Sequence, residues 1–418
     1  TLLLDYRRIE VKIVDEKLLK SMNYLKELAD DERQIIRDAK EKSRSGNHEE
    51  ALILFREAIQ RFPDDKDLHE QFAWELQKEG KLIFEKDKID LQQARRLLAD
   101  YIKLKNSRPS QLHSLFLRFA DKITDKEEFK LIAFLKLWDL NNLREEDFQG
   151  FSTDGNTYPS IAEKIIQHGA KLILDKSMGD EVEYFMPFLD NGIQRFQDNI
   201  WLTYYKAKLL HLINRNLEAV EFLIPVVKEK ISEYWTWNLL AELLIESDKE
   251  KSVSCFCKAL LCKGEDKFLA NVRIRFAELL FERGYFNEAK LEVAVAIKAK
   301  EDEGVVIPDK LRNYQKSNWY INAPLKSNNI DFYNNHKLLA EELIFSSYPW
   351  LDGCIGKSFI IPEKPNKPRR KLYIKLSNEI IDVTISASKF RTRNLDIGEA
   401  LRIKGEYDKE RTFQIYLL

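Results

Sequence analysis

Residues 32–65 carry small residues at regular positions, and this spacing constrains the fold more than any other feature of the chain. Counted from Glu32 as position 1, alanine stands at 8, 20 and 27, glycine at 15, phenylalanine at 24 and proline at 32: Ala39, Gly46, Ala51, Phe55, Ala58 and Pro63. Small residues at these positions let two antiparallel helices approach closely, and glycine suits the left-handed end of the first helix. Proline stops the second helix because it has no amide hydrogen to donate. The segment therefore predicts a helical hairpin.

The same spacing recurs along the chain. Ala73 and Gly80 repeat positions 8 and 15, and alanines keep the register in residues 270–303, 234–268 and, more weakly, 200–230. On these residues the chain resembles the tetratricopeptide-repeat family over roughly half of its length. The resemblance implies a superhelix of helix pairs whose concave surface binds other proteins.

We expect a mostly α chain, a tetratricopeptide-type helical solenoid with a small C-terminal all-β barrel of OB/cold-shock-like type. Residues 1–31 are an N-terminal segment that we expect to be incomplete, because the chain starts with threonine. The solenoid covers residues 32–307, with a divergent middle at 108–198 and a polar loop near 150–160. Residues 308–354 form a capping helix, DFYNNHKLLAEELIF, and a linker, and residues 355–418 form the barrel.

Beyond residue 355 apolar and polar residues alternate, as is typical of strands. The five strand-like runs are SFIIP, RKLYIKL, EIIDVTIS, EALRIKGEY and RTFQIYLL, which suit a small closed barrel. Residues 356–418 hold 14 lysines and arginines against 8 acidic residues, whereas the rest of the chain holds 54 against 61. The basic end favours an anionic partner, although solubility alone accounts for such a charge.

Basic and aromatic residues alternate on one face of the second strand, and more cations follow the third. Single-stranded nucleic acid needs this arrangement, because its bases stack on rings and its phosphates attract cations. The alternative is a solvated strand face whose lysines prevent aggregation. The candidate nucleic-acid-binding residues are Lys371, Tyr373, Lys375, Lys389, Phe390, Arg391 and Arg393.

Positions 5 and 9 of each tetratricopeptide repeat line the concave groove, by the same resemblance. The residues at these positions are the candidate protein-binding groove: Tyr204, Lys208, Asn238, Glu242, Ile274 and Glu278. With its two glutamates and nearby aromatic residues, this groove should prefer a segment of mixed apolar and basic character. The alternative is that each residue only packs within the solenoid.

Nothing in the sequence indicates an enzyme, a cofactor or a metal site. Cys255 and Cys257 point to different sides of a helix, Cys354 is remote, and the spacing fits no zinc module, so we expect buried core cysteines. No nucleophile, zinc-protease or Walker pattern occurs. No run of apolar residues is long enough to span a membrane, and the start of the chain does not read as a signal peptide. These features predict a soluble, cytoplasmic protein.

Two functions follow from the residues. The first is a non-catalytic scaffold or adaptor that binds a protein partner through the helical repeats. The alternative is an adaptor whose barrel holds single-stranded RNA or DNA. The phrases EEDFQ, DGNTYPSIAEK and FYNNHKLLAEELIF, followed by the barrel, are similar to repeat-plus-barrel proteins of bacterial conflict (anti-phage) gene clusters. That similarity implies a defence role and transfers no catalytic residue.

Overall fold

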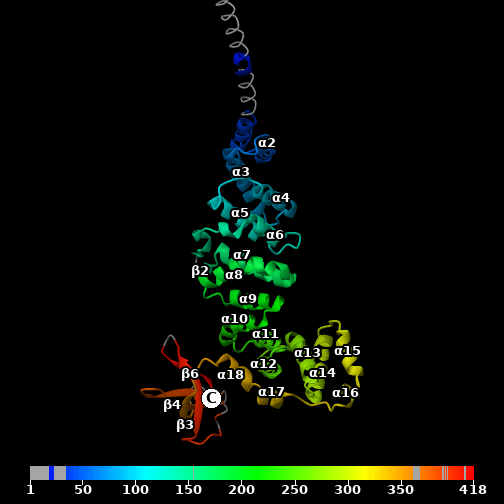
Figure 1. Cartoon of the computed structure of the whole chain (residues 1–418), viewed down its shortest axis with the longest axis vertical. Coiled ribbons are helices and arrows are strands. Elements are labelled where there is room, and N and C mark those ends of the chain that lie inside the picture. The colour runs from blue at the N-terminus through cyan, green and yellow to red at the C-terminus, as the bar shows by residue number, and fades with distance from the viewer. Residues whose placement is uncertain are drawn as a thin grey trace, which may run out of the picture. The chain divides into compact units, whose positions relative to one another are not determined.

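The computed structural model describes residues 18–22, 34–153, 155–360, 368–387, 390, 392, 394–408 and 411–418. It divides into two compact units, unit 1 (residues 1–202) and unit 2 (residues 203–418). Helices make up most of both units, and the main sheet lies in the last part of the chain (Figure 1). The prediction of a mostly α chain with a small C-terminal β domain is confirmed.

Unit 1 consists of helices joined by short turns, and α7 and α8 lie side by side in Figure 1. Along the chain, α2 packs on α3, α3 on α4 and α5, and α5 on α7. After a helical stretch over 34–44, its elements are α2 (His48–Arg61), α3 (Lys66–Phe84), α4 (Leu91–Ile102), α5 (Gln111–Asp121), α6 (Leu131–Trp138), η1 (Leu140–Asn142), η2 (Glu145–Phe148), β1 (Phe151–Thr153), β2 (Asn156–Tyr158), α7 (Ile161–Asp175), η3 (Gly179–Glu181) and α8 (Val182–Arg195).

The first repeat folds as its spacing predicts. The three alanines at positions 8, 20 and 27 are fully buried between the helices. Gly46 has a φ of 80°, the left-handed conformation that a side chain disfavours, and it ends the first helix. Phe55 fills the space between helices and stacks on Phe72 of α3, with 5.8 Å between the ring centroids.

The second repeat departs from the pattern at Gly80. The spacing predicts a helix end there, but α3 continues to Phe84 and Gly80 lies buried inside it. A Cβ atom at Gly80 would lie 2.4 Å from Cε2 of Phe119 on α5. Because glycine has no side chain, the Phe119 ring can approach the backbone of α3 closely, and α3 and α5 can pack together.

The polar stretch near 150–160 forms a hairpin where the sequence predicts a loop. β1 pairs antiparallel with β2, and the rings of Phe151 and Tyr158 stack at a centroid distance of 4.9 Å. Gly155 has a φ of 77° at the turn. Both aromatic rings are exposed, so the hairpin is held by cross-strand pairing and not by a core.

Unit 2 combines helix pairs with a β domain. The pairs α11–α12 and α13–α14 pack closely, as repeats of this kind do. Its helices are α9 (Ile200–Leu212), which begins at the unit boundary, α10 (Asn216–Glu229), α11 (Tyr234–Leu244), α12 (Lys249–Leu261), α13 (Asp266–Glu282), α14 (Phe286–Asp302), α15 (Asp309–Lys316), α16 (Asn318–Asn322), α17 (Ile330–His336) and α18 (Leu338–Ile344).

The end of the helical repeats differs from the prediction. Residues 309–322, expected to be irregular, form α15 and α16. Leu311 of α15 is fully buried against Ala277, Val293 and Ala296, so α15 covers the last apolar face of the α13–α14 pair. The expected single capping helix divides at Lys337 into α17 and α18, and both pack against α12. The chain thus folds back over earlier helices and reaches α12 as well as the α13–α14 pair.

A buried carboxylate fixes this return of the chain. Glu292 of α14 is fully buried and accepts hydrogen bonds from Arg273 Nη1 at 2.7 Å and from Asn329 Nδ2 at 2.6 Å. The hydroxyl of Tyr333 on α17 also donates to it. Burial lowers the pKa of Arg273, but the charges of and hydrogen bonds to Glu292 and Tyr333 together outweigh burial and raise that pKa overall. The cluster therefore ties α13, α14 and α17 together.

The β domain is a five-stranded antiparallel sheet in the order β5-β4-β3-β6-β7. Its strands are β3 (Leu351–Phe359), β4 (Arg369–Lys375), β5 (Ile380–Ser386), β6 (Ala400–Tyr407) and β7 (Phe413–Leu417), so the first strand begins before the predicted boundary at 355. Leu372 and Ile374 are fully buried with Ile355 and Ile403, as the alternation predicts. Among the described residues β5 and β7 are the two ends of the sheet order.

The outer face of β6 and β7 contacts the end of α18. The rings of Phe345 and Tyr416 stack at a centroid distance of 4.6 Å, and Lys404 Nζ donates to the carbonyl of Phe345 at 2.9 Å. Tyr348 and Tyr416 both donate their hydroxyls to Glu406, at 2.8 and 2.9 Å. These contacts involve only β6 and β7, and β4 and β5 lie at the other end of the sheet order.

Candidate functional site

The predicted protein-binding residues of α9 and α11 keep partly exposed side chains. Tyr204 of α9 meets Trp235 of α11 edge to face, with 4.7 Å between the ring centroids. Burial raises the pKa of Tyr204 to about 12. Lys208 Nζ lies 5.7 Å from the centre of the Tyr204 ring, and Asn238 Nδ2 donates to Glu242 Oε1 at 3.0 Å. The structure thus brings an aromatic pair, a cation and a carboxylate onto α9 and α11, each the first helix of its repeat.

The two predicted residues of α13 have partners within the chain. Ile274 packs against the apolar cluster that contains Leu311. Glu278 forms ion pairs with Lys310 of α15 at 2.7 Å and with Arg275 at 2.6 Å. Because residues of α13 and α15 already engage these two side chains, we limit the candidate protein-binding surface to α9 and α11.

The predicted nucleic-acid-binding face is partly present on β4. Leu372 and Ile374 point into the core, while Tyr373 is 42% exposed and Lys375 is exposed on the opposite face. Lys371 forms an ion pair with Asp382 of β5, the residue opposite Tyr373 in the register, and that pair cancels one of the predicted cations.

The segment after β5 contains four of the predicted residues, of which three lie outside the described residues. Phe390, predicted as a second stacking ring, packs against the apolar core of the sheet. Arg370, which the sequence interpretation did not use, is buried and donates to the carbonyls of Gly356, Thr392 and Leu395. Lys389, Arg391 and Arg393 lie outside the described residues.

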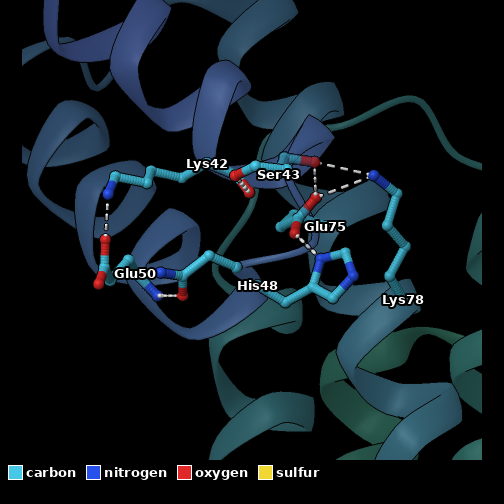
Figure 2. A network of polar contacts seen from close by, with 8 residues as sticks. Lys42, Ser43, His48, Glu50, Glu75 and Lys78 are labelled. Atoms are coloured by element: carbon cyan, nitrogen blue, oxygen red, sulfur yellow. Dashed lines mark hydrogen bonds and ion pairs between the residues drawn. The ribbon is translucent and has the colours of Figure 1, made fainter.

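A polar cluster joins the helix over 34–44 to α2 and α3 (Figure 2). Glu75 of α3 is 2% exposed, and Ser43 Oγ donates to its Oε2 at 2.5 Å. His48 Nδ1 lies 2.5 Å from Glu75 Oε1, and Lys78 Nζ donates to Glu75 Oε2 at 3.1 Å and to Ser43 Oγ at 2.8 Å. Burial raises the pKa of Glu75, but its hydrogen bonds to Ser43, His48 and Lys78 outweigh burial and lower it overall.

Serine, histidine, lysine and a carboxylate, the side chains of this cluster, are also the side chains of nucleophilic catalysis. The imidazole contacts the carboxylate and not the serine hydroxyl, and the hydroxyl donates its own hydrogen to Glu75. Glu75 accepts the hydrogen of this hydroxyl, but its lowered pKa makes the carboxylate a weak base, whereas a general base works best with a pKa near the working pH. The cluster therefore holds three helices together and does not activate Ser43. Ser43 and Glu75 lie 32 residues apart, and no sequence motif predicts that the cluster forms.

Of the four cysteines, two lie in the core, and Cys262 and Cys354 are partly exposed. Cys255 and Cys257 are fully buried, and burial raises the pKa of both thiols. Among the residues that the structure describes, no group of three histidine, cysteine or acidic side chains could hold a metal ion. None of the described helices has the length and apolar character needed to cross a bilayer.

The structure also contains a groove that the sequence interpretation did not identify. It lies in unit 1 along α4 and α6 and has a volume of about 920 Å³. Its lining residues come from 92–103 and 128–137, two segments whose apolar residues look like ordinary core in the sequence. Only the packing of the helices shows that part of this apolar surface stays open.

A family model and several solved structures are similar to parts of the chain. A family model described as a domain of unknown function (DUF7017) matches residues 200–340. Among curated proteins, none matches the chain. The chain is similar to a tetratricopeptide repeat protein from Parabacteroides merdae, with 10% identity, a TM-score of 0.33 and coverage of 70% of this chain and 99% of that one. It is also similar to a human IFIT1 dimer with PPP-AAAA, with 15% identity, a TM-score of 0.35 and coverage of 71% and 67%.

Proposed function

We propose that the protein is a non-catalytic adaptor that binds a partner protein on the surface formed by α9 and α11. The observation that carries the proposal is a group of four partly exposed side chains on these two helices. They are Tyr204, Lys208, Asn238 and Glu242. An aromatic pair offers a large rigid contact area, and a carboxylate beside it selects for a cation. The partner segment is then apolar and basic.

A charge reversal in this surface tests the proposal. Short peptides are selected against the full chain from a random display library, and the selected peptides are measured by fluorescence polarisation. We expect apolar, basic peptides that bind Glu242→Lys about tenfold more weakly, a loss of about 1.4 kcal/mol. Glu221→Lys, the same change at an exposed position of α10, is the matched control. Selected peptides that bind wild type and Glu242→Lys equally would contradict the proposal.

The second candidate function is single-stranded nucleic-acid binding by the β domain. The first strand of the sheet pairs with the second and the fourth, which supports an OB-type domain. In that fold the face of the second and third strands binds oligonucleotides, and here it carries Tyr373 and Lys375. We also propose a cytoplasmic location and a role in bacterial defence, and both rest on the sequence alone.

Binding of the full chain to labelled single-stranded RNA and DNA at several salt concentrations tests this second function. We expect binding that weakens with salt and that falls about tenfold or more in Tyr373→Ala, since one stacked base contributes about 1–3 kcal/mol. Tyr158→Ala, at a similarly exposed tyrosine of the β1–β2 hairpin, is the control. Equal binding by wild type and Tyr373→Ala would remove the β4 face from consideration.

A further inference from the structure

The groove along α4 and α6 has an apolar floor and open apolar sides. Leu98, Phe129 and Phe134 are buried and form its floor. Ala99 and Ala133 are exposed at its sides, and Leu137 is 63% exposed. An exposed leucine and two exposed alanines above a buried apolar floor form a continuous apolar surface, and surfaces of this kind in folded proteins are commonly interaction sites.

The rim of the groove is basic. Arg95, Arg96, Lys103 and Lys130 line it and are exposed, whereas Glu128 is the single acidic residue among the lining residues. None of the four cations forms an ion pair or a side-chain hydrogen bond with a residue that the structure describes. Free cations around an apolar floor favour a ligand that brings negative charge on both sides of an apolar strip.

The small residues determine which ligand shape fits. Ala99 on α4 and Ala133 on α6 leave room for another backbone to approach, and a groove lined by two helices offers a third helix apolar surface on both sides. An amphipathic helix laid in an apolar groove is a recurring mode of peptide recognition. We propose that the groove along α4 and α6 binds an amphipathic helix of a partner protein whose apolar face is flanked by aspartate and glutamate.

Nucleic acid fits this groove less well. Its cations could contact phosphates, but base stacking needs exposed rings, and the two phenylalanines of the lining lie buried in the floor. The exposed apolar residues are aliphatic, and a polyanion that covered them would gain nothing from their burial.

This groove is separate from the proposed protein-binding surface on α9 and α11. It lies in the other unit of the chain, and it selects acidic segments where Glu242 selects basic ones. The two proposals therefore fail independently, because a variant of one surface leaves the other intact.

Two designed helical peptides test the proposal on the full chain. Both carry leucine at i, i+3, i+4 and i+7 and a fluorescein label, and they differ only in having glutamate or lysine beside the leucine strip. Binding is measured by fluorescence polarisation for wild type, Arg95→Glu/Arg96→Glu and Ala99→Gln. The control is Arg118→Glu/Lys171→Glu, which reverses two exposed cations of unit 1 outside the groove lining. Circular dichroism confirms that each variant is folded.

We expect the glutamate peptide to bind wild type and the control alike, and to bind Arg95→Glu/Arg96→Glu about tenfold or more weakly. Ala99→Gln should weaken binding of the same peptide without any change in charge. Equal binding of the lysine peptide, or equal binding of the glutamate peptide to all variants, would overturn the proposal. Single-stranded RNA that binds wild type but not Arg95→Glu/Arg96→Glu would reassign the groove to nucleic acid. Self-association that depends on Ala99 would reassign it to a second copy of the chain.

Discussion

Acidification should loosen unit 1 at one buried histidine, His113 of α5. The ring has no exposed surface, and both of its nitrogens have partners. Nδ1 lies 2.7 Å from the hydroxyl of Tyr101, and Nε2 lies 2.9 Å from the carbonyl of Trp138. The neutral ring satisfies both, with Nε2–H donating to the carbonyl and Nδ1 accepting from the hydroxyl. Burial lowers the pKa of His113 from 6.5 to about 4.

The size of the effect follows from these two pKa values. Because the folded pKa lies below the unfolded one, the unfolded chain binds the proton first as the pH falls. The stability that the neutral ring contributes is therefore complete above about pH 6.5 and decreases as the pH falls toward 4. Between pH 7 and pH 5 the loss amounts to about 2 kcal/mol.

Hydrogen exchange of residues 111–138, followed by mass spectrometry at pH 7 and pH 5, measures the local opening free energy. His113→Gln keeps a donor and an acceptor but has no charge to gain. We expect wild type to lose about 2 kcal/mol more than His113→Gln between the two pH values. His211→Gln, in the other unit, should respond like wild type. Equal losses in wild type and His113→Gln would refute the reasoning.

Three substitutions at other buried positions should lower the free energy of unfolding, measured by urea denaturation. Glu75→Gln should cost about 1–3 kcal/mol near pH 7, and the cost should shrink below pH 4.5 as wild-type Glu75 itself becomes protonated. Glu292→Gln removes the buried counter-charge of Arg273, leaves it the exposed Asp266 at 3.5 Å, and should cost about 3–5 kcal/mol; an unchanged midpoint would contradict this. Gly80→Ala should cost about 1–3 kcal/mol by clashing with Phe119, and Phe119→Leu in the same chain should recover part of that loss.

The sequence predicted those features that depend on short-range spacing. The alanines of the first repeat and the left-handed Gly46 followed from helix geometry, and Leu372 and Ile374 of β4 followed from the two-residue period of a strand. In each case the residues that decide the structure lie within one repeat or one strand.

Features that depend on distant contacts could not be predicted in this way. Gly80 reads as a helix end, and only the ring of Phe119 shows why it lies inside α3. The packing of α17 on earlier helices involves pairs distant in the sequence, such as Glu292 and Tyr333, which lie 41 residues apart. The groove along α4 and α6 depends on a space between helices, which no spacing in the sequence encodes.

The return of α17 and α18 to α12 changes how unit 2 should unfold. A linear stack of repeats has free ends, and such an array frays one repeat at a time because each repeat contacts only its neighbours. In unit 2 the chain passes through α13 to α16 and then packs on α12. The helices that precede the last repeat in the chain therefore contact the helices that follow it. Opening α13 and α14 therefore requires releasing α17 as well, and these helices should exchange their amide hydrogens as one cooperative block.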